Sequence, residues 1–481
     1  MTPGAGSATG RVVLMAAVAA IGGFLFGFDT AVINGAVTSV QLQYHAGAFV
    51  LGLAVSAALI GSAVGALTAG RLADHFGRIP VMVMAAVLFI IQSFGVGLAF
   101  NVVDFSIWRF IGGIAVGAAS VIAPAYIAES APARMRGRLG SFQQLAIVIG
   151  IFIAALVDFA LAHAAGGAGN SFWLGVPAWR WMFLSEVIPA AIYLVGALTI
   201  PESPRYLVAT GHLDKARAVL VNIEGERQAD GKVAEIQQTL STEHKPTFRD
   251  LRGRVGLLPI VWVGIALSVF QQFVGINVIF YYSSVLWQAV GFSQSQALTI
   301  TVITNLTNVI TTLVAIATID RFGRKPLLLI GSLGMVVTLG TMAFLFGTAP
   351  LNSAGQPVLH GGNGPVALVA ANVYVFFFGM SWGPVVWVLL GEMFPNRIRA
   401  AALGLAAAMQ WVANFVVSTT FPELKNIGLG YAYGIYALAA ALSFLFVVSF
   451  IRETRGRELE HMTGAVGPQD QQAKAPRATT S

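Results

Sequence analysis

The sequence has no cysteine and few charged residues. Asp, Glu, Lys and Arg together make up only 10% of its 481 residues, against about 25% in soluble globular proteins. Without cysteine the chain can form neither disulfides nor thiolate metal sites. It also lacks the Gly-x-x-x-x-Gly-Lys-Ser/Thr loop that binds nucleotide phosphates and the His-Glu-x-x-His pattern of zinc enzymes. We therefore expect neither an enzyme nor a nucleotide-driven pump, and no metal or cofactor.

Hydrophobic residues make up 56% of the chain, and its mean hydropathy is +0.76. They gather into twelve runs, each near the roughly 20 residues that a helix needs to cross a bilayer. The runs lie near residues 12–34, 49–70, 79–100, 105–127, 138–160, 180–200, 257–289, 296–318, 326–347, 365–391, 398–420 and 431–451. This pattern predicts an all-α polytopic membrane protein with six spans on each side of a polar stretch.

Positive charges are concentrated in alternate loops between these runs. If the N-terminus is cytoplasmic, nearly all of the 28 Lys and Arg residues fall in cytoplasmic loops, in the polar stretch or in the tail. This is the distribution that the positive-inside rule describes. It predicts that both termini face the cytoplasm of a bacterial-type inner membrane, and it explains the net charge of +7 without a nucleic-acid partner.

Loop motifs repeat at about half the length of the chain. Asp-x-Phe-Gly-Arg begins at Asp74 and again at Asp320, 246 residues later. Glu-x-x-Pro-x-Arg-x-Arg begins at Glu129 and again at Glu392, 263 residues later. Arg-rich loops that merely obey the topology would not need identical spacing. The repeats favour a duplicated transporter whose halves rock around a central site.

The repeats divide the chain into four units. A looser match between Pro201–Arg205 and Arg452–Gly456 follows each half. The expected units are a six-helix half at 1–200, a cytoplasmic helical linker at 201–256, a second six-helix half at 257–456 and a tail at 457–481. Because the tail is polar and low in apolar residues, we expect it to be disordered.

The charged residues of the repeated loops are candidates for a cytoplasmic gate. They are Asp74, Arg78, Glu129, Arg136, Asp320, Arg324, Glu392 and Arg399. We expect the four acids to pair with loop arginines only when the two halves close on the cytoplasmic side. The pairs would then latch the outward-open state, each contributing little alone and more as part of a network.

Further motifs occur in a specific order along the chain. They are Gly27-Phe-Asp29-Thr, Arg109-Phe-Ile-Gly-Gly, Pro201-Glu-Ser-Pro-Arg205, Gln271-Gln272-Phe-Val-Gly-Ile-Asn277, Trp382-Gly-Pro-Val-Val-Trp387 and Gln410-Trp411. From about Gly22 to Gly456 the sequence resembles the sugar porter family of the major facilitator superfamily, which includes bacterial xylose and glucose proton symporters and animal glucose facilitators. The resemblance implies two pseudo-symmetric six-helix bundles joined by the linker. One departure is Arg452, where the family's closing motif usually begins with proline.

A sugar site needs side chains that both donate and accept hydrogen bonds, and an aromatic surface for the ring. The resemblance implies sugar contacts for Gln144, Gln271, Gln272, Asn277, Asn308, Trp387 and Gln410, and Trp411 is a further aromatic candidate. Any one of these amides could instead bond a neighbouring helix, which is worth about 1 kcal/mol, and the tryptophans could be interfacial anchors. Gln271 and Asn277 flank a glycine that permits local unwinding inside the membrane.

Two apolar positions bear on the identity of the sugar. Ile151 and Phe280 match glucose-carrying relatives, whereas xylose-preferring relatives have a polar amide and a leucine there. An apolar wall suits the larger ring and hydroxymethyl group of a hexose. The resemblance therefore favours a hexose such as D-glucose over D-xylose, although such pocket changes discriminate by only about 1–3 kcal/mol.

Three charged residues lie at a similar depth inside the predicted spans. With a rise of about 1.5 Å per residue, Asp29, Arg109 and Glu186 all fall in the outer half of the membrane, where charges are costly and usually functional. We expect protonation of Asp29 to release Arg109 and to let the halves close around sugar, with Glu186 assisting. The alternative is a static ion pair between the first and fourth spans. Asp104 and Asp158, near the outer ends of their spans, are expected to be solvated.

Together these patterns predict a proton-coupled monosaccharide symporter that works by alternating access. Its partners would be the sugar, the proton and membrane lipid, and it would act as a monomer. The resemblance gives symporters Asp at the position of Asp29 and passive facilitators commonly Asn. A passive facilitator with the same fold is the first alternative. A non-transporting sugar sensor is the second, disfavoured because such sensors usually carry a longer tail.

Overall fold

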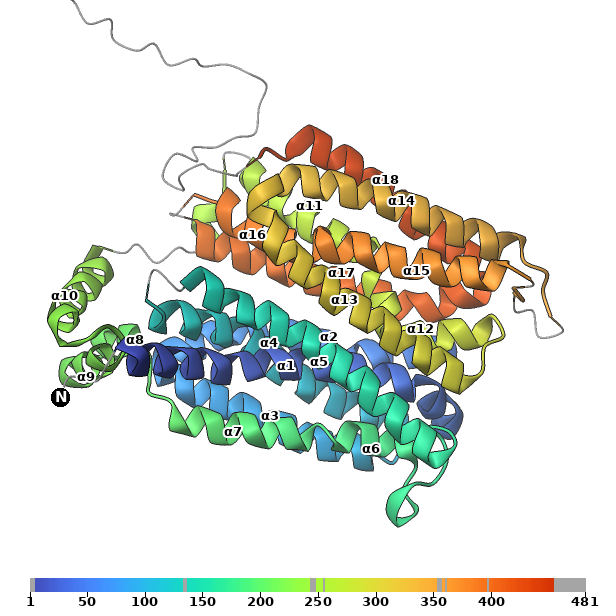
Figure 1. Cartoon of the computed structure of the whole chain (residues 1–481), viewed down its shortest axis with the longest axis horizontal. Helices are drawn as coiled ribbons and strands as arrows, with labels where there is room; N and C mark the ends of the chain where they lie inside the picture. Colours follow the sequence, from blue (N-terminus) through green and yellow to red (C-terminus); the bar gives the residue numbers. More distant parts are fainter. Residues whose placement is uncertain are drawn as a thin grey trace, which may run out of the picture.

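The described part of the chain is built from membrane-length helical spans. The computed structural model describes residues 5–132, 136–242, 248–253, 256–352, 357–359, 361–395 and 398–453, so the expected tail at 457–481 lies outside the described residues. Within them, 12 helical segments are long and apolar enough to cross a membrane. Figure 1 shows these segments side by side along one direction. The predicted all-α fold with twelve spans is confirmed.

The spans form two groups of six in chain order. The first group comprises α1 (Ala5–Tyr44), α2 (Ala48–Phe76), α3 (Arg78–Leu98), α4 (Val102–Ser130), α5 (Arg136–Ala165) and a sixth span divided into α6 (Ala178–Leu184) and α7 (Val187–Thr199), with the short turn η1 (Trp173–Gly175) before it. Between the groups lie α8 (Pro204–Ala209), α9 (Leu213–Glu224), α10 (Glu226–Thr242) and η2 (Phe248–Leu251). The second group comprises α11 (Pro259–Phe273) with α12 (Ile276–Ala289), α13 (Gln294–Phe322), α14 (Arg324–Thr348), α15 (Asn363–Met380) with α16 (Trp382–Met393), α17 (Arg399–Ile427) and α18 (Leu429–Phe450).

Three spans are interrupted near residues that do not continue a regular helix. Pro189 follows the α6–α7 break and Pro384 follows the α15–α16 break, and each lacks the N–H that would bond four residues back. Gly275 separates α11 from α12 with φ +87°, a conformation that favours glycine. Interrupted spans expose main-chain groups inside the membrane, which is where transporters commonly build their sites.

Glycines let neighbouring helices of the first group pack backbone against backbone. A Cβ atom at Gly61 or Gly113 would overlap a carbonyl oxygen of the partner helix in the α2–α4 pair, and one at Gly27 would do the same in the α1–α5 pair. Helices in lipid gain no hydrophobic free energy by associating, so such close approach is a common source of their association. The glycines thus hold the helices of the first group tightly together.

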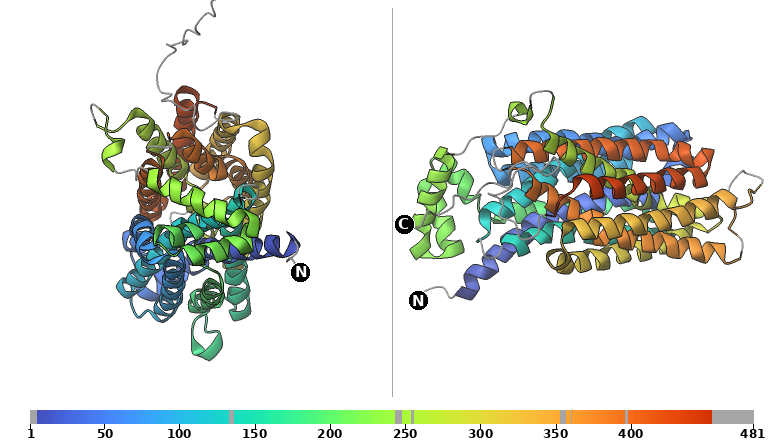
Figure 2. Two further views of the ribbon diagram at one scale, coloured as in Figure 1. Left: turned by 90° about the vertical axis from the view of Figure 1, so that its left-hand side faces the viewer. Right: turned by 90° about the horizontal axis from the view of Figure 1, so that it is seen from above.

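The two ends of the bundle differ. Helices α8–α10 lie together at one end, called here the linker end, and the opposite end is the far end (Figures 1 and 2). Asn34 of α1 donates to the Phe280 carbonyl of α12 and accepts from the Ser284 N–H, both at 2.9 Å. Further side-chain hydrogen bonds between the two groups of spans lie in the same half, toward the far end. The groups are therefore joined at the far end.

The first span is longer than predicted. It ends at Tyr44, whereas its apolar run was expected to end near residue 34. The extra residues include polar side chains, yet Ala36, Val37 and Val40 are at most 1% exposed. This stretch is buried by neighbouring helices rather than by lipid, so its hydropathy underestimates the length of the helix.

The helices between the groups pack on one another. Leu207, Val208 and Ala216 form a small buried cluster between α8 and α9. Arg11 at the start of the first span donates to Asn222 Oδ1 of α9 at 2.6 Å. On the solvated side, a hydrogen bond from Arg217 lowers the pKa of the exposed Asp230 carboxyl. These contacts tie α8–α10 to the linker end of the first group.

Candidate functional site

A cluster of ionisable side chains lies buried inside the first group of spans. Arg109 Nη1 of α4 contacts Asp29 Oδ1 of α1 at 2.8 Å and also donates to the Asp29 main-chain oxygen at 3.1 Å. Asp29 and Glu186 have no exposed surface and Arg109 has 1%. The three residues predicted to couple the proton thus belong to one buried region.

Gln92 of α3 connects the two acids, and the sequence reasoning missed it. Its Nε2 donates to Asp29 Oδ1 at 3.0 Å and to Glu186 Oε2 at 2.6 Å. Ser93 Oγ donates to the same Glu186 oxygen at 3.1 Å. Gln92 is fully buried. An amide inside an apolar run was the available signal.

The break in the sixth span positions Glu186. Since Pro189 has no N–H, the Ser185 carbonyl lacks its usual helical donor and accepts instead from the Ile188 N–H at 3.2 Å. Glu186 lies in this turn, directly before α7. From the turn its carboxyl reaches the Gln92 and Ser93 side chains of α3.

Each acid leaves one carboxyl oxygen without a hydrogen-bond partner. Within the described residues, Asp29 Oδ2, Glu186 Oε1 and Arg109 Nε are all buried and unpartnered. If both acids were ionised, the cluster would carry a net negative charge inside the membrane, which costs about 2.5 kcal/mol or more. One proton on either acid balances the guanidinium. The arrangement can therefore take up and release a proton.

Asp158 is buried, so the expectation that it is solvated was wrong. Its side chain on α5 is 1% exposed, and Oδ2 accepts from the Gly35 N–H of α1 at 3.1 Å. A Cβ atom at Gly35 would lie 2.6 Å from this side chain. The carboxyl occupies the space left by the glycine, which a reading of hydropathy alone does not reveal.

A chain of amides crosses the break in the seventh span. Asn277 Nδ2 donates to Gln272 Oε1, and Gln272 Nε2 donates to Gln271 Oε1 at 3.3 Å. Gln271 Nε2 in turn donates to the main-chain oxygens of Trp382 and Gly383 in α16 at 2.8 and 3.1 Å. Both amide hydrogens of Gln271 are therefore used within the protein. Asn277 is half-buried and keeps surface for a ligand.

The break itself is stabilised by tyrosines. A Cβ atom at Gly275 would lie 2.8 Å from the ring of Tyr436. The Val274 carbonyl beside it accepts from Tyr374 Oη at 2.7 Å. The predicted unwinding at this glycine is present, and its main-chain groups have partners.

The remaining predicted sugar ligands come from both groups of spans. They are Gln144 and Ile151 on α5, Phe280 on α12, Asn308 on α13, Trp387 on α16, and Gln410 and Trp411 on α17. Ile151, Phe280 and Asn308 are buried, whereas Trp387 is 40% exposed. Gln410 Oε1 is buried without a partner among the described residues, and Trp411 packs on Phe26 of α1 with ring centroids 5.7 Å apart. The Phe26–Trp411 contact joins the two groups beside these candidates.

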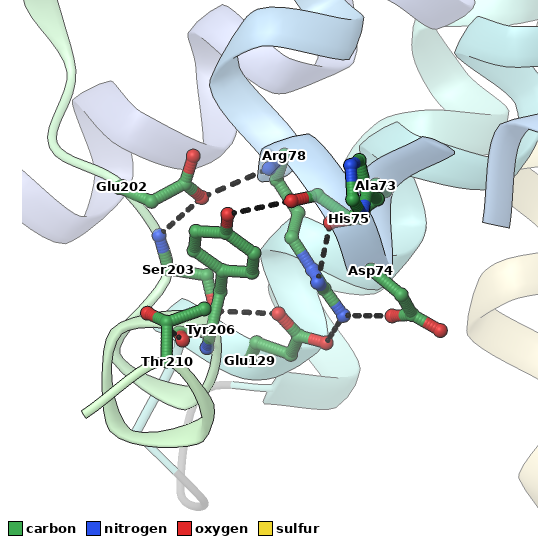
Figure 3. A network of polar contacts seen from close by, with 9 residues as sticks. All are labelled: Ala73, Asp74, His75, Arg78, Glu129, Glu202, Ser203, Tyr206 and Thr210. Atoms are coloured by element: carbon green, nitrogen blue, oxygen red, sulfur yellow. Dashed lines mark hydrogen bonds and ion pairs between the residues drawn. The ribbon is translucent and has the colours of Figure 1, made fainter. Parts of the chain in front are cut away.

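A polar network organised by Arg78 lies at the linker end of the first group (Figure 3). Arg78 Nη2 contacts Glu129 at 2.9 Å and Asp74 at 3.2 Å. The Arg78 N–H donates to Glu202 at 3.0 Å, and Ser203 Oγ donates to Glu129 at 2.5 Å. The network joins the end of α2, the start of α3, the end of α4 and the residues directly before α8.

The second group repeats this network. Arg324 donates to both carboxylate oxygens of Glu392, at 2.7 and 3.1 Å, and its N–H donates to Glu453 at 3.0 Å. Glu453 thus corresponds to Glu202, and Arg324 to Arg78. The loose third sequence repeat is therefore a structural equivalence, since Glu202 accepts from the first main-chain N–H of α3 and Glu453 from the first main-chain N–H of α14.

These ion pairs lie within each group, not between the groups. Glu129 pairs with Arg78 and Glu392 with Arg324 in a structure whose groups are joined at the far end. Each arginine faces a neighbouring segment of its own group, so these two pairs do not by themselves join the halves, and the latching of the outward-open state by the gate charges stays a prediction. The side chains of Arg136, Asp320 and Arg399 lie outside the described part of the chain, and their roles stay predictions.

The sequence matches the profile of one protein family along most of its length. The family is described as sugar (and other) transporter, and the match covers residues 15–465. The chain belongs to this sugar transporter family. It is 60% identical over 454 residues to the glucose transport protein of Synechocystis sp., covering 94% of this chain and 97% of the relative. It is 41% identical over 485 residues to the D-xylose-proton symporter of Escherichia coli, covering 94% and 95%.

A solved structure agrees with this assignment. The xylose transporter XylE from E. coli, in a partially occluded inward-open conformation, matches with a TM-score of 0.80 at 39% identity, covering 93% of this chain and 100% of that one. This member of the sugar transporter family is therefore a multi-pass membrane transporter, not an enzyme, and it shares the major facilitator fold.

Proposed function

We propose that this transporter carries a monosaccharide together with a proton by alternating access, with a hexose such as D-glucose as the preferred substrate. The observation that carries the proposal is the buried cluster in which Asp29 pairs with Arg109 and a second acid, Glu186, is linked to Asp29 through Gln92. A passive carrier has no need of such a cluster. The names of the relatives, a glucose transport protein and a D-xylose-proton symporter, support the same substrate class.

In this mechanism Asp29 takes up the coupling proton. Protonation removes the negative charge that holds Arg109 at 2.8 Å, so α1 and α4 are freed to shift relative to one another. Glu186 assists because, once Asp29 is protonated, the Glu186 carboxylate is the negative charge that remains in the cluster to balance Arg109. The alternative from the sequence was a static ion pair between Asp29 and Arg109. It is disfavoured because it gives no reason for a second buried acid, Glu186, in the same cluster.

The sugar site lies between the two groups of spans. Asn277, Gln272, Gln410 and Asn308 offer amides, Gln144 offers one from the first group, and Trp387 and Trp411 offer aromatic surface. Ile151 and Phe280 supply the apolar wall that favours a hexose. Gln271 acts differently from its neighbours, because its hydrogens bond α16; we assign it to holding the break in place.

The transporter is proposed to sit as a monomer in the bacterial inner membrane with both termini cytoplasmic. The linker end is then the cytoplasmic end, and the four units expected from the sequence, 1–200, 201–256, 257–456 and 457–481, apply. Because the groups are joined at the far end, this arrangement corresponds to an inward-facing state, in line with the inward-open relative.

The test is uptake of labelled D-glucose and D-xylose into proteoliposomes, with and without an inward proton gradient, by the natural protein and by Asp29→Asn. A potential of 100 mV supplies about 2.3 kcal/mol per charge, which equals roughly 50-fold accumulation. We expect uphill uptake by the natural protein and only downhill exchange by the variant. Equilibration that ignores the gradient would make the protein a facilitator, and binding without uptake would make it a sensor.

A further inference from the structure

We propose that Gln92 is the positioning residue through which Asp29 and Glu186 act as a single proton site. The inference rests on the proposed symport and adds a residue to it. Gln92 lies on α3, Asp29 on α1 and Glu186 at the α6–α7 break, so one amide links three spans. No other described side chain hydrogen-bonds both acids.

The hydrogen bonds of Gln92 use its full donor capacity. An amide nitrogen has two hydrogens, and the shortest contacts of Nε2 are Asp29 Oδ1 at 3.0 Å and Glu186 Oε2 at 2.6 Å. Each hydrogen bond favours the ionised form of the acid that accepts it. When the hydrogen bond from Gln92 to one acid becomes stronger, its hydrogen bond to the other acid becomes weaker. Protonation of either acid therefore changes the hydrogen bond that stabilises the ionised form of the other.

The amide also suits the protonated state. A protonated carboxyl is a donor, and a carbonyl oxygen accepts from it. Gln92 Oε1 is buried without a partner in the described residues, so a rotation of the amide would present an unused acceptor to the acid that has gained the proton. A leucine in place of Gln92 could neither donate to the ionised acids nor accept from a protonated one, and a glutamate there would add a third negative charge.

The protein makes room for this side chain. A Cβ atom at Gly112 of α4 would lie 2.7 Å from Gln92 Oε1 and Cδ. Gly112 follows Arg109 by three residues, so one helix supplies both the cation and the space for the amide. The arrangement is therefore built by two independent elements of the sequence, the amide in α3 and the glycine in α4.

The charged and titratable groups around the amide are few. They are Asp29, Arg109 and Glu186 within the first group and Tyr281 on α12 of the second, which interacts electrostatically with Arg109 and Asp29. Asp158 and Tyr193 lie elsewhere on α5 and α7 and do not bond Gln92. The pH dependence of the pair is thus set by one cation, one amide and the two acids.

A double-mutant cycle on the purified natural protein tests the inference. The pH midpoint of sugar binding is measured by tryptophan fluorescence with D-glucose, or with D-xylose if that sugar binds more tightly, in the natural protein, Glu186→Gln, Gln92→Leu and the double variant. We expect Glu186→Gln to shift the midpoint and the shift to fall by at least half in the Gln92→Leu background. Gly112→Ala, which displaces the amide without touching an acid, should reduce the shift in the same direction.

Controls separate this result from misfolding and from failure of the proposed function. Gln143→Leu replaces another buried amide of the first group and should leave the Glu186→Gln shift unchanged. An equal shift with and without Gln92 would overturn the inference while leaving symport intact. If the natural protein binds sugar with no dependence on pH, the proposed symport fails first and the inference fails with it.

Discussion

Gln271 and Asn277 are members of one amide chain, but the structure gives them different tasks. Gln271→Leu removes two hydrogen bonds to α16 and one from Gln272. Each such bond in a membrane protein is worth about 0.6–1.7 kcal/mol, so the loss of all three destabilises the packing around the break by roughly 2–5 kcal/mol if they add. We expect a large fall in the melting temperature of the purified protein.

Asn277→Ala should act on the sugar instead. It removes one bond to Gln272 and the side chain with surface for a ligand. One or two lost bonds to sugar hydroxyls cost about 1–3 kcal/mol, which raises the sugar Kd roughly 5- to 150-fold. The melting temperature without sugar should change less than in Gln271→Leu.

The two variants are compared by melting temperature and by sugar binding, with Asn372→Leu as a matched amide control. Asn372 bonds only its own helix and Thr307 among the described residues, so its loss should be mild in both assays. If Gln271→Leu melted like the natural protein and yet bound no sugar, Gln271 would be a ligand and the division of tasks would be wrong.

Two further changes test the packing and the loop networks. Gly113→Ala places a methyl group against the Ala58 carbonyl and should abolish the monodisperse protein peak in size-exclusion chromatography. The control Gly434→Ala, whose added methyl group meets open space, should keep the peak. Peaks of equal size for the two variants would contradict the backbone packing. Glu392→Gln weakens the two charged hydrogen bonds from Arg324, each worth about 1.5–3 kcal/mol when buried and less here because Glu392 is 25% exposed. It should lower the melting temperature more than the exposed control Glu423→Gln, and an effect no larger than the control would mean that the network adds no stability.

The fold could be predicted because its signals are strong and local. Each span needs a long apolar run whatever its neighbours are, and the loop motifs repeat with fixed spacing. The unwinding at Gly275 was also predictable, since a glycine between amides within an apolar span is typical of an interrupted helix. The side-chain contacts between different helices were harder to predict.

The misses share one physical cause. Gln92 and Asp158 owe their roles to partners on other helices, Glu186 and Gly35, and hydropathy along a single helix carries no information about such partners. The pairing of Arg78 with Glu129 and of Arg324 with Glu392 inside each group could not be foreseen for the same reason, because spacing identifies a charged loop but not the loop that it faces. The sugar ligands came from the family resemblance, and the division of tasks between Gln271 and Asn277 became visible only in three dimensions.

The central claim is that sugar and proton move together through Asp29. The most direct measurement is the proton flux that sugar drives: D-glucose is added to proteoliposomes without an imposed gradient, and the external pH is recorded. We expect the medium to become more alkaline on sugar addition with the natural protein and to stay unchanged with Asp29→Asn, while labelled sugar still equilibrates in both. Sugar entry by the natural protein with no change in external pH would contradict the claim.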